Sequence, residues 1–327
     1  MALIPKDLVA IEPVVEPAAD PDPYRPKDAP VKTIQGRSPW RLSIERLSQD
    51  RAAMISLGVL VFMALLAIFA PVVASLTGHS VTEQFRHAGL TPEGLPKPPT
   101  HVFILGTDDQ GRDVLVRIAY GARISLIVGL VATTLTVAVG TIMGLAAGYL
   151  GGIVDTIVAR LVDVVLSIPY LLFAVALVSI SQPSLGLVIF VITFFEWGAV
   201  CRIVRGQVLS IREREYIEAS RSLGASAARI MFIDILPNVA AQVTVLLTLL
   251  IPASILFEAA LSFLGVGIPP PTADWGQMIS DAQQYYQQAW WFFVFPSLAL
   301  LVTTVAFNIF GDGVRDSLDP RALAKEK

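Results

Sequence analysis

The feature that most constrains this chain is a series of long apolar stretches between residues 52 and 310. About 20 apolar residues in a helix cross the hydrocarbon core of a bilayer. Six stretches reach or approach this length: 52–76, 124–149, 157–180, 185–201, 239–264 and 290–310. Backbone groups inside lipid must bond within their own segment, which a helix allows. The sequence therefore predicts an all-α polytopic membrane protein with six transmembrane helices.

Composition supports the membrane class. Of the 327 residues, 54% are hydrophobic and 16% are charged, and the mean hydropathy is +0.65, more apolar than a soluble domain of this size requires. Nothing in the sequence favours nucleic-acid binding. The single cysteine, Cys201, excludes an intramolecular disulfide. His79, His87 and His101 are irregularly spaced in one polar segment, which is typical of solvated side chains, so we predict no metal site; coordination there is the alternative.

The placement of positive charge predicts which side of the membrane each loop faces. The loops at residues 181–186 and 265–289 carry no Lys or Arg, as is typical of the outer side. Positive residues precede the first apolar stretch and crowd the connection between the fourth and the fifth: Lys32, Arg37, Arg41, Arg46 and Arg51, then Arg202, Arg205, Arg212, Arg214, Arg221 and Arg229. With six spans, this pattern predicts that both termini are cytoplasmic.

We divide the chain into three parts. Residues 1–40 are rich in proline and have no apolar run, so they predict a disordered cytoplasmic tail. They also lack the features of a signal peptide, so we expect insertion to begin at an internal span. Residues 41–321 form the predicted transmembrane domain, and residues 322–327 form a second cytoplasmic tail.

A polar connection at residues 206–238 separates the fourth span from the fifth. Within it, Tyr216 to Ala228 combines good helix formers with small residues. Gly224 is placed to end a helix, and Pro237 is placed to begin the next one. This pattern predicts a short cytoplasmic helix whose small side chains let another protein come close to its backbone, as a docking helix requires.

This connection resembles the Glu-Ala-Ala loop of bacterial ABC importer permeases, in which Glu-Ala-Ala is followed by Gly and later by Leu-Pro. The matching residues are Glu218, Ala219, Ser220, Gly224, Leu236 and Pro237. Ser220 replaces the second alanine, and Asp234 stands where many relatives carry isoleucine. The resemblance implies that these residues couple the chain to an ATPase; an ordinary amphipathic connector is the alternative. We expect hydrogen bonds to nearby backbone, or to Arg214 or Arg221, to fix Glu218.

The segment from Leu105 to Leu126 carries a second resemblance. Its Val114, Ile118 and Ala122 have helical spacing, which predicts a helix that enters the second span. The segment is similar to the signature of the dipeptide, oligopeptide and nickel permeases, Gly-Thr-Asp-x-x-Gly-Arg-Asp followed by Tyr-Gly-Ala-Arg-x-Ser-Leu. Segments similar to the family's closing motifs are Glu258–Gly267, Pro270–Gly276 and Ala306–Arg321. The matches cover residues 40 to 321 and imply the type I ABC importer permease fold.

The family resemblance implies a division of labour. All six lysines, Lys6, Lys27, Lys32, Lys97, Lys325 and Lys327, lie outside any phosphate-binding Gly-x-x-x-x-Gly-Lys-Ser/Thr motif. The chain is then not an enzyme and needs no cofactor of its own, because ATP and Mg would bind to two cytoplasmic ATPase subunits. A second homologous permease would complete the pore in the bacterial inner membrane, and an extracytoplasmic binding protein would deliver a peptide-like solute.

Two further sets of polar residues are candidate sites. Asp108, Asp109, Arg112 and Asp113 are predicted to dock the binding protein or hold an outer gate; capping of the Val114 helix by Asp109 or Asp113 is the alternative. Glu258 and Glu196 lie within spans, where ionisable residues are expensive, so they are possible pore residues. Bonding to a neighbouring helix is the alternative. If they carried protons, the chain would be an ion-coupled secondary transporter, the rival function.

Some residues predict packing. Three glycines of the second span share one face, which favours close helix approach: Gly140, Gly144 and Gly148. Arg160 and Asp163 are one turn apart and predict an ion pair. The outer aromatic belt is expected to include Trp275, Trp290 and Trp291.

Overall fold

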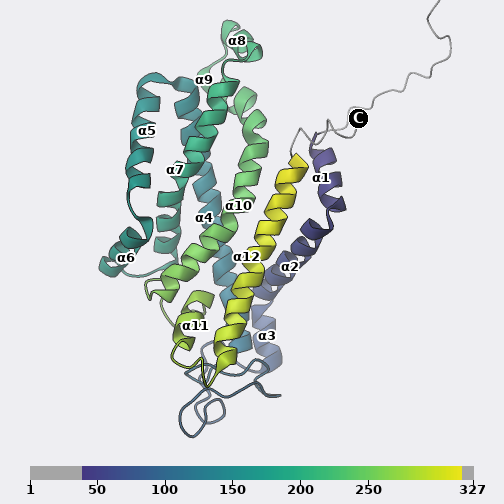
Figure 1. Ribbon diagram of the computed structural model, residues 1–327, viewed down its shortest axis with the longest axis vertical. Helices are drawn as coiled ribbons and strands as arrows, with labels where there is room; N and C mark the ends of the chain where they lie inside the picture. Colours follow the sequence, from purple (N-terminus) through teal and green to yellow (C-terminus); the bar gives the residue numbers. More distant parts are fainter. Residues whose placement is uncertain (1–38, 319–327) are drawn as a thin grey trace, which may run out of the picture. The chain divides into compact units, whose positions relative to one another are not determined.

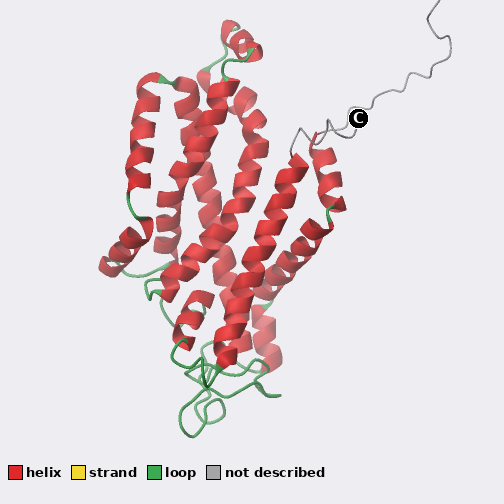
Figure 2. Cartoon of the chain, in the orientation of Figure 1, coloured by secondary structure: helices red, strands yellow, loops and turns green. Residues whose placement is uncertain are grey.

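The computed structural model describes residues 39–318 as helices joined by turns and loops, with no strand among them (Figure 2). The tails expected at residues 1–40 and 322–327 lie outside this range, apart from residues 39 and 40. Five helices in the described range are long and apolar enough to cross a membrane: Arg51–Ile68 (α2), Val114–Leu150 (α4), Leu185–Ile211 (α7), Leu236–Phe263 (α10) and Trp290–Leu318 (α12). Four of them carry one expected apolar stretch each, whereas the expected first span, at residues 52–76, is divided at Phe69 between α2 and Ala70–Thr77 (α3).

The third expected span, at residues 157–180, is not one straight helix. It consists of Gly152–Ser167 (α5) and Tyr170–Ile180 (α6), which are bent by 81° at the break between them. Pro169 lies at this break, and the residue before a proline is pushed out of the helical region. Ile168 accordingly has an extended ψ of 128°. If the bent pair counts as one span, the described residues contain six.

The remaining helices are short and lie near the ends of the long ones. They are Pro39–Gln49 (α1), Ala70–Thr77 (α3), Glu215–Ser222 (α8), Ala227–Arg229 (α9), the π-helix Ile230–Ile235 (η1) and Trp275–Ala282 (α11). α8 lies at one end of the bundle, whereas α11 and the loop of residues 78–113 lie at the other (Figure 1). We call these the α8 end and the α11 end.

The helix that was expected to enter the second span is confirmed and is continuous with that span. It begins at Val114 because the side chain of Asp113 accepts hydrogen bonds from the backbone N–H groups of Leu115, at 2.8 Å, and Val116, at 3.3 Å. The helically spaced residues Val114, Ile118 and Ala122 are all buried in one apolar cluster. The helical spacing of residues 114–122 and the apolar stretch 124–149 together therefore predicted the extent of α4.

The predicted glycine face of α4 is confirmed as a packing surface against α7. A Cβ atom on Gly140, Gly144 or Gly148 would lie 2.6 to 2.8 Å from Val200, Val204 or Val208, respectively. Residue numbers rise together along the two helices, so α4 and α7 run parallel. α4 also supplies residues to all three apolar clusters of the fold, which makes it the central helix.

Candidate coupling site

The coupling segment, which we define as residues 212–235, contains a short helix, α8, in the first half of the stretch predicted as helical, Tyr216 to Ala228; α8 ends at Ser222, and Ala227–Arg229 forms α9. Ile217 is fully buried and packs into an apolar cluster with residues of α7, η1 and α10. In contrast, Glu218 and Ala219 are exposed, and Leu223 is 88% exposed at the tip. The bundle therefore holds α8 by one apolar side chain and leaves the small-residue face uncovered.

Gly224 ends α8 through its backbone conformation. Its φ is +79°, a left-handed value that glycine adopts without steric cost. Its N–H donates to the carbonyl of Arg221 at 3.0 Å, and the N–H of Ala225 donates to the carbonyl of Ser220 at 3.1 Å. These two bonds form a Schellman motif. No atom lies within 4 Å of the position that a Cβ on Gly224 would take, so the space beside it is open.

Glu218 does not make the contacts expected from the sequence. Among the described residues, none forms an ion pair or hydrogen bond with its carboxylate, and the Arg221 guanidinium instead lies over the Tyr149 ring at 5.8 Å from its centroid. Glu218 lies on the exposed face of α8, which leaves its side chain without these contacts. Its carboxylate is thus available to a partner.

The segment returns to the membrane through η1 and α10. α10 begins at Leu236, with proline in its first turn as predicted for Pro237. Leu236 packs against the apolar cluster that holds Ile217, whereas Pro237 is exposed. Asp234, in the π-helix, has a buried Oδ2 without a hydrogen-bond partner in the described chain, so this departure from isoleucine places a polar atom in a packed position.

At the α11 end, the predicted outer residues are mostly interior. The fully buried Asp108 accepts hydrogen bonds from the backbone N–H of Arg112, at 2.8 Å, and from its Nε, at 2.6 Å. The Nε of Arg117 lies 3.3 Å from the same carboxylate. Arg112 is 5% exposed and Arg117 is 2% exposed. The expected surface for these side chains is therefore absent, and a role in docking or gating stays a prediction.

Asp113 combines two contacts. Its Oδ1 caps α4, which is the alternative considered for this residue, and its Oδ2 lies 2.6 Å from Nδ1 of His79. The His79 ring stacks on Phe103. His79 is therefore a buried structural residue of the outer loop, unlike the solvated side chain expected from its spacing.

Asp109 is the most exposed carboxylate of this outer cluster. Burial, followed by the negative charge of Asp108, raises the pKa of Asp109 to about 6, while the charges of Arg112 and Arg117 oppose that shift. Arg112 Nη2 lies 3.7 Å from Asp109 Oδ1. Of the four residues predicted to form the docking or gating site, Asp109 is thus the one most accessible to solvent.

Two of the three tryptophans expected in the outer aromatic belt are instead interior. Trp275 is fully buried and donates from Nε1 to the carbonyl of Ile118 at 3.1 Å; Trp291 is 5% exposed and donates to the carbonyl of Thr107 at 3.2 Å. Only Trp290, at 53% exposure, has the open surface of a belt residue. Hydrogen bonds to backbone carbonyls let the indoles of Trp275 and Trp291 be buried.

The two intramembrane carboxyls bond to neighbouring helices. Glu258 is fully buried and accepts hydrogen bonds from Ser125 of α4, at 3.2 Å, and from Ser262 one turn away, at 3.0 Å. Glu196 of α7 accepts one from Ser254 of α10 at 3.3 Å. These contacts favour the packing alternative for both residues, and their role in a pore stays a prediction.

Ion pairs join α5 to α7. The Arg160–Asp163 pair is confirmed at 3.8 Å, and Arg202 of α7 lies nearer to Asp163, at 3.1 Å. The sequence did not reveal the Arg205–Asp155 pair, in which Arg205 Nη2 donates to Oδ2 at 2.8 Å. These residues are 50 positions apart, so only helix packing brings them together.

The fold and site define a class of protein, a multi-span helical subunit of a membrane transporter. The chain belongs to the binding-protein-dependent transport system inner membrane component family, whose model matches residues 140–323. Residues 38–92 match the N-terminal TM domain of oligopeptide transport permease C. The chain is a permease subunit of this family, so it is a pore component.

Proteins of several bacteria are similar over most of the chain. The dipeptide transport system permease protein DppC of Escherichia coli (strain K12) is 45% identical over 273 residues, which are 84% of this chain and 90% of that protein. DppC of Bacillus subtilis (strain 168) is 42% identical, covering 86% of this chain and 84% of its own. The oligopeptide transport system permease protein OppC of the same strain is 37% identical, covering 98% and 99%.

Proposed function

We propose that this chain forms half of the translocation pore of an ABC importer for dipeptides or oligopeptides. A second homologous permease forms the other half, two cytoplasmic ATPase subunits bind ATP and Mg, and an extracytoplasmic binding protein delivers the peptide. The names of the relatives support the substrate class. The coupling mechanism is supported by the exposure of α8. Ile217 anchors this helix to the bundle, and its small-residue face is uncovered.

The proposed coupling is mechanical. α8 joins α7 to α10 through the coupling segment, and the buried Ile217 belongs to an apolar cluster that contains residues of both helices. A force that an ATPase exerts on α8 would therefore reach two membrane helices through this cluster. The exposed residues Glu218, Ala219 and Gly224 would form the contact, since no described residue covers them.

The proposed orientation places the α8 end in the cytoplasm, together with both termini. It is supported by the arginines of residues 202–229 at this end and by the absence of Lys and Arg from residues 265–289. A single cysteine introduced at Gln283, which is exposed after α11, should react with an impermeant reagent in intact cells. Reaction at a cysteine replacing Ser222 of α8 under the same conditions would overturn the orientation.

The proposed function is tested by identifying the energy source of peptide uptake. The complex of this chain with its permease, ATPase and binding-protein partners is reconstituted in vesicles, and uptake of a radiolabelled dipeptide is measured. We expect uptake to require ATP and to persist without a proton gradient. Uptake that follows a proton gradient without ATP would instead show an ion-coupled secondary transporter.

The role of α8 is tested by Glu218→Lys. Glu213→Lys, which lies just before α8 and outside its small-residue face, is the matched control. Glu213 is exposed and pairs only with the neighbouring Arg212, at 2.8 Å, among the described residues. We expect Glu218→Lys to reduce co-purification of the ATPases and peptide uptake without loss of the chain from the membrane. Normal uptake with bound ATPases in this variant would contradict a coupling role for Glu218.

A further inference from the structure

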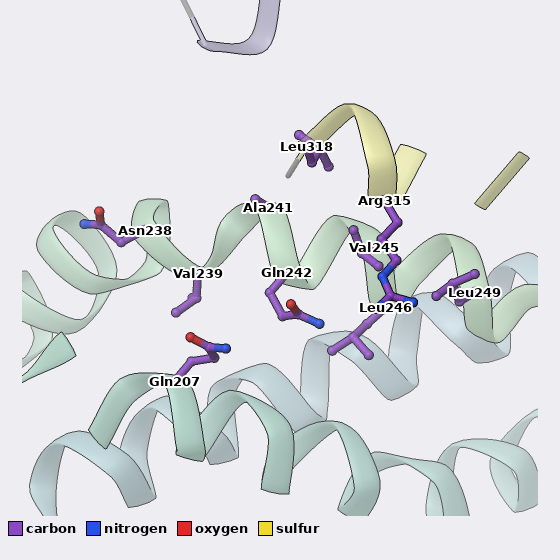
Figure 3. Close-up of a pocket in the computed structure, with 10 residues that line it drawn as sticks. All are labelled: Gln207, Asn238, Val239, Ala241, Gln242, Val245, Leu246, Leu249, Arg315 and Leu318. Atoms are coloured by element: carbon purple, nitrogen blue, oxygen red, sulfur yellow. The ribbon is translucent and has the colours of Figure 1, made fainter. Parts of the chain in front are cut away.

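A cavity of about 560 Å³ lies among α7, α10 and α12 (Figure 3). Its size is within the range of sites that bind small molecules. The lining combines aliphatic side chains with Gln207, Asn238, Gln242 and Arg315. In Figure 3, the side chains of Gln207 and Gln242 point toward the space between α7 and α10, and Arg315 reaches into it from α12, whereas Asn238 points away.

Three of these polar groups are uncommitted. Within residues 39–318, no hydrogen bond or ion pair involves the side chain of Gln207, Gln242 or Arg315, whereas Asn238 donates to the carbonyl of Asp234 at 2.6 Å. Of the ten described lining residues, Arg315 alone is charged. Long polar side chains on membrane helices commonly face a cavity or a pathway. These three share one such cavity.

The cavity also has a mechanical position. Gln207 lies four residues before the end of α7, and Asn238 lies in the first turn of α10, so the coupling segment connects two of its walls. Arg315 is in the last turn of α12, the third wall. Any movement of α8 that separates α7 from α10 would change the width of the cavity.

We propose that this cavity is a peptide-binding station in the α8 half of the pathway, an inference that rests on the proposed function. The side-chain amides of Gln207 and Gln242 bond to the peptide's main-chain N–H and C=O groups, which is independent of peptide sequence. The Arg315 guanidinium binds the C-terminal carboxylate, whose geometry matches its paired donors. The station therefore selects for a free C-terminus and tolerates varied side chains.

The test follows access to the cavity in the purified complex. Leu246→Cys, at an aliphatic residue of the lining, is made in a Cys201→Ala background, and its alkylation by N-ethylmaleimide is followed by mass spectrometry over a concentration series of tri-alanine. Ser210→Cys, exposed on α7 but outside the lining, is the matched control. We expect tri-alanine to slow alkylation at position 246 and to leave alkylation at position 210 unchanged.

The carboxylate contact is tested by repeating the series with tri-alanine amide and with Arg315→Gln. Loss of a hydrogen bond to a charged group predicts that about tenfold more peptide is needed for protection in either case. Arg160→Gln, at an exposed arginine of α5 remote from the cavity, should have no effect. Arg315→Lys, which keeps the charge, should recover part of the protection.

The outcomes separate the inference from the function on which it rests. Equal protection of the cysteine by tri-alanine and by its amide, or equal protection by tri-alanine with and without Arg315→Gln, would overturn the assignment of Arg315. If the cysteine variant imports peptide with ATP but tri-alanine gives no protection at any concentration, the cavity is not a peptide station and the proposed function stands. Absence of ATP-dependent uptake in wild type would instead refute the proposed function.

Discussion

The two ends of the bundle differ in the burial and pairing of their charged side chains. At the α11 end, Asp108 and Arg112 are buried and bonded to each other, and Arg117 lies against them. At the α8 end, Glu218 is exposed and without a partner in the described chain, although the sequence there is just as rich in charge. The charges of Asp108, Arg112 and Arg117 are thus paired within the chain. The coupling segment, in contrast, is open to another protein.

The glycines of the two ends show the same difference. A Cβ on Gly276, in α11, would lie 2.4 Å from the carbonyl oxygen of Ala259, so no side chain fits there. Gly224 has free space around it and is required only for its positive φ. A tightly packed α11 end and an uncovered α8 end suit a subunit that receives force at one end. The following predictions test this contrast, in decreasing order of their effect on the stability of the chain.

The largest effect is expected from Arg112→Glu. This change places a carboxylate beside Asp108 in a buried site and removes the paired charge, which costs about 3 to 5 kcal/mol. Thermal unfolding of the purified chain in detergent should show a large loss of stability, whereas Glu213→Lys at the other end should show little. A folded Arg112→Glu protein that regains transport with excess binding protein would instead favour docking.

Gly276→Ala should be the next in size. Its added methyl group meets the backbone of Ala259, and overpacking of this kind costs about 1 to 3 kcal/mol. The matched control is Gly58→Ala in α2, where no atom lies within 4 Å of the new methyl group. The unfolding temperatures of the two variants are compared, and equal values would show that α11 packs less tightly than described.

Gly224→Val should cost about 1 kcal/mol in backbone strain, since valine avoids a positive φ and the exposed tip can relax. Its effect on coupling should be much larger than its effect on folding, because the substitution changes the direction in which the chain leaves α8. ATPase co-purification and uptake are measured beside Gly186→Val, at an open site with an ordinary φ. Unchanged uptake in Gly224→Val would remove the turn from the coupling mechanism.

The smallest effect concerns pH at Asp109, whose pKa is raised to about 6 in the folded chain. A carboxyl with a raised folded pKa contributes stability that is fully present below its unfolded pKa, near 4, and is lost as pH rises through about 6. Wild type should therefore gain stability relative to Asp109→Asn between pH 7 and pH 5, by less than about 1 kcal/mol after solvent screening. Unfolding temperatures at both pH values check this. Glu83→Gln, at an exposed carboxyl of the loop of residues 78–113, is the control. A parallel pH response of wild type and Asp109→Asn would contradict the prediction.

The sequence by itself determined the features that depend on neighbouring residues. Apolar length located the spans, and the spacing of Gly140, Gly144 and Gly148 marked the packing face of α4. Gly224 and Pro237 set local backbone geometry, so the end of α8 and the start of α10 could be predicted from them. The motifs also carried the family assignment, because they are long and chemically mixed.

Only the tertiary structure decided which polar side chains are internal and which are free. Asp108 and Glu218 are both carboxylates in polar segments of the sequence that also contain arginines. Asp108 is buried against an arginine, whereas Glu218 is exposed. Trp275 was predicted to lie in the aromatic belt, but it is buried because the carbonyl of Ile118, 157 positions away, accepts its hydrogen bond. The cavity with Gln207, Gln242 and Arg315 draws on three helices. Contacts between residues far apart in sequence depend on helix packing, and local patterns of charge and hydropathy do not encode them.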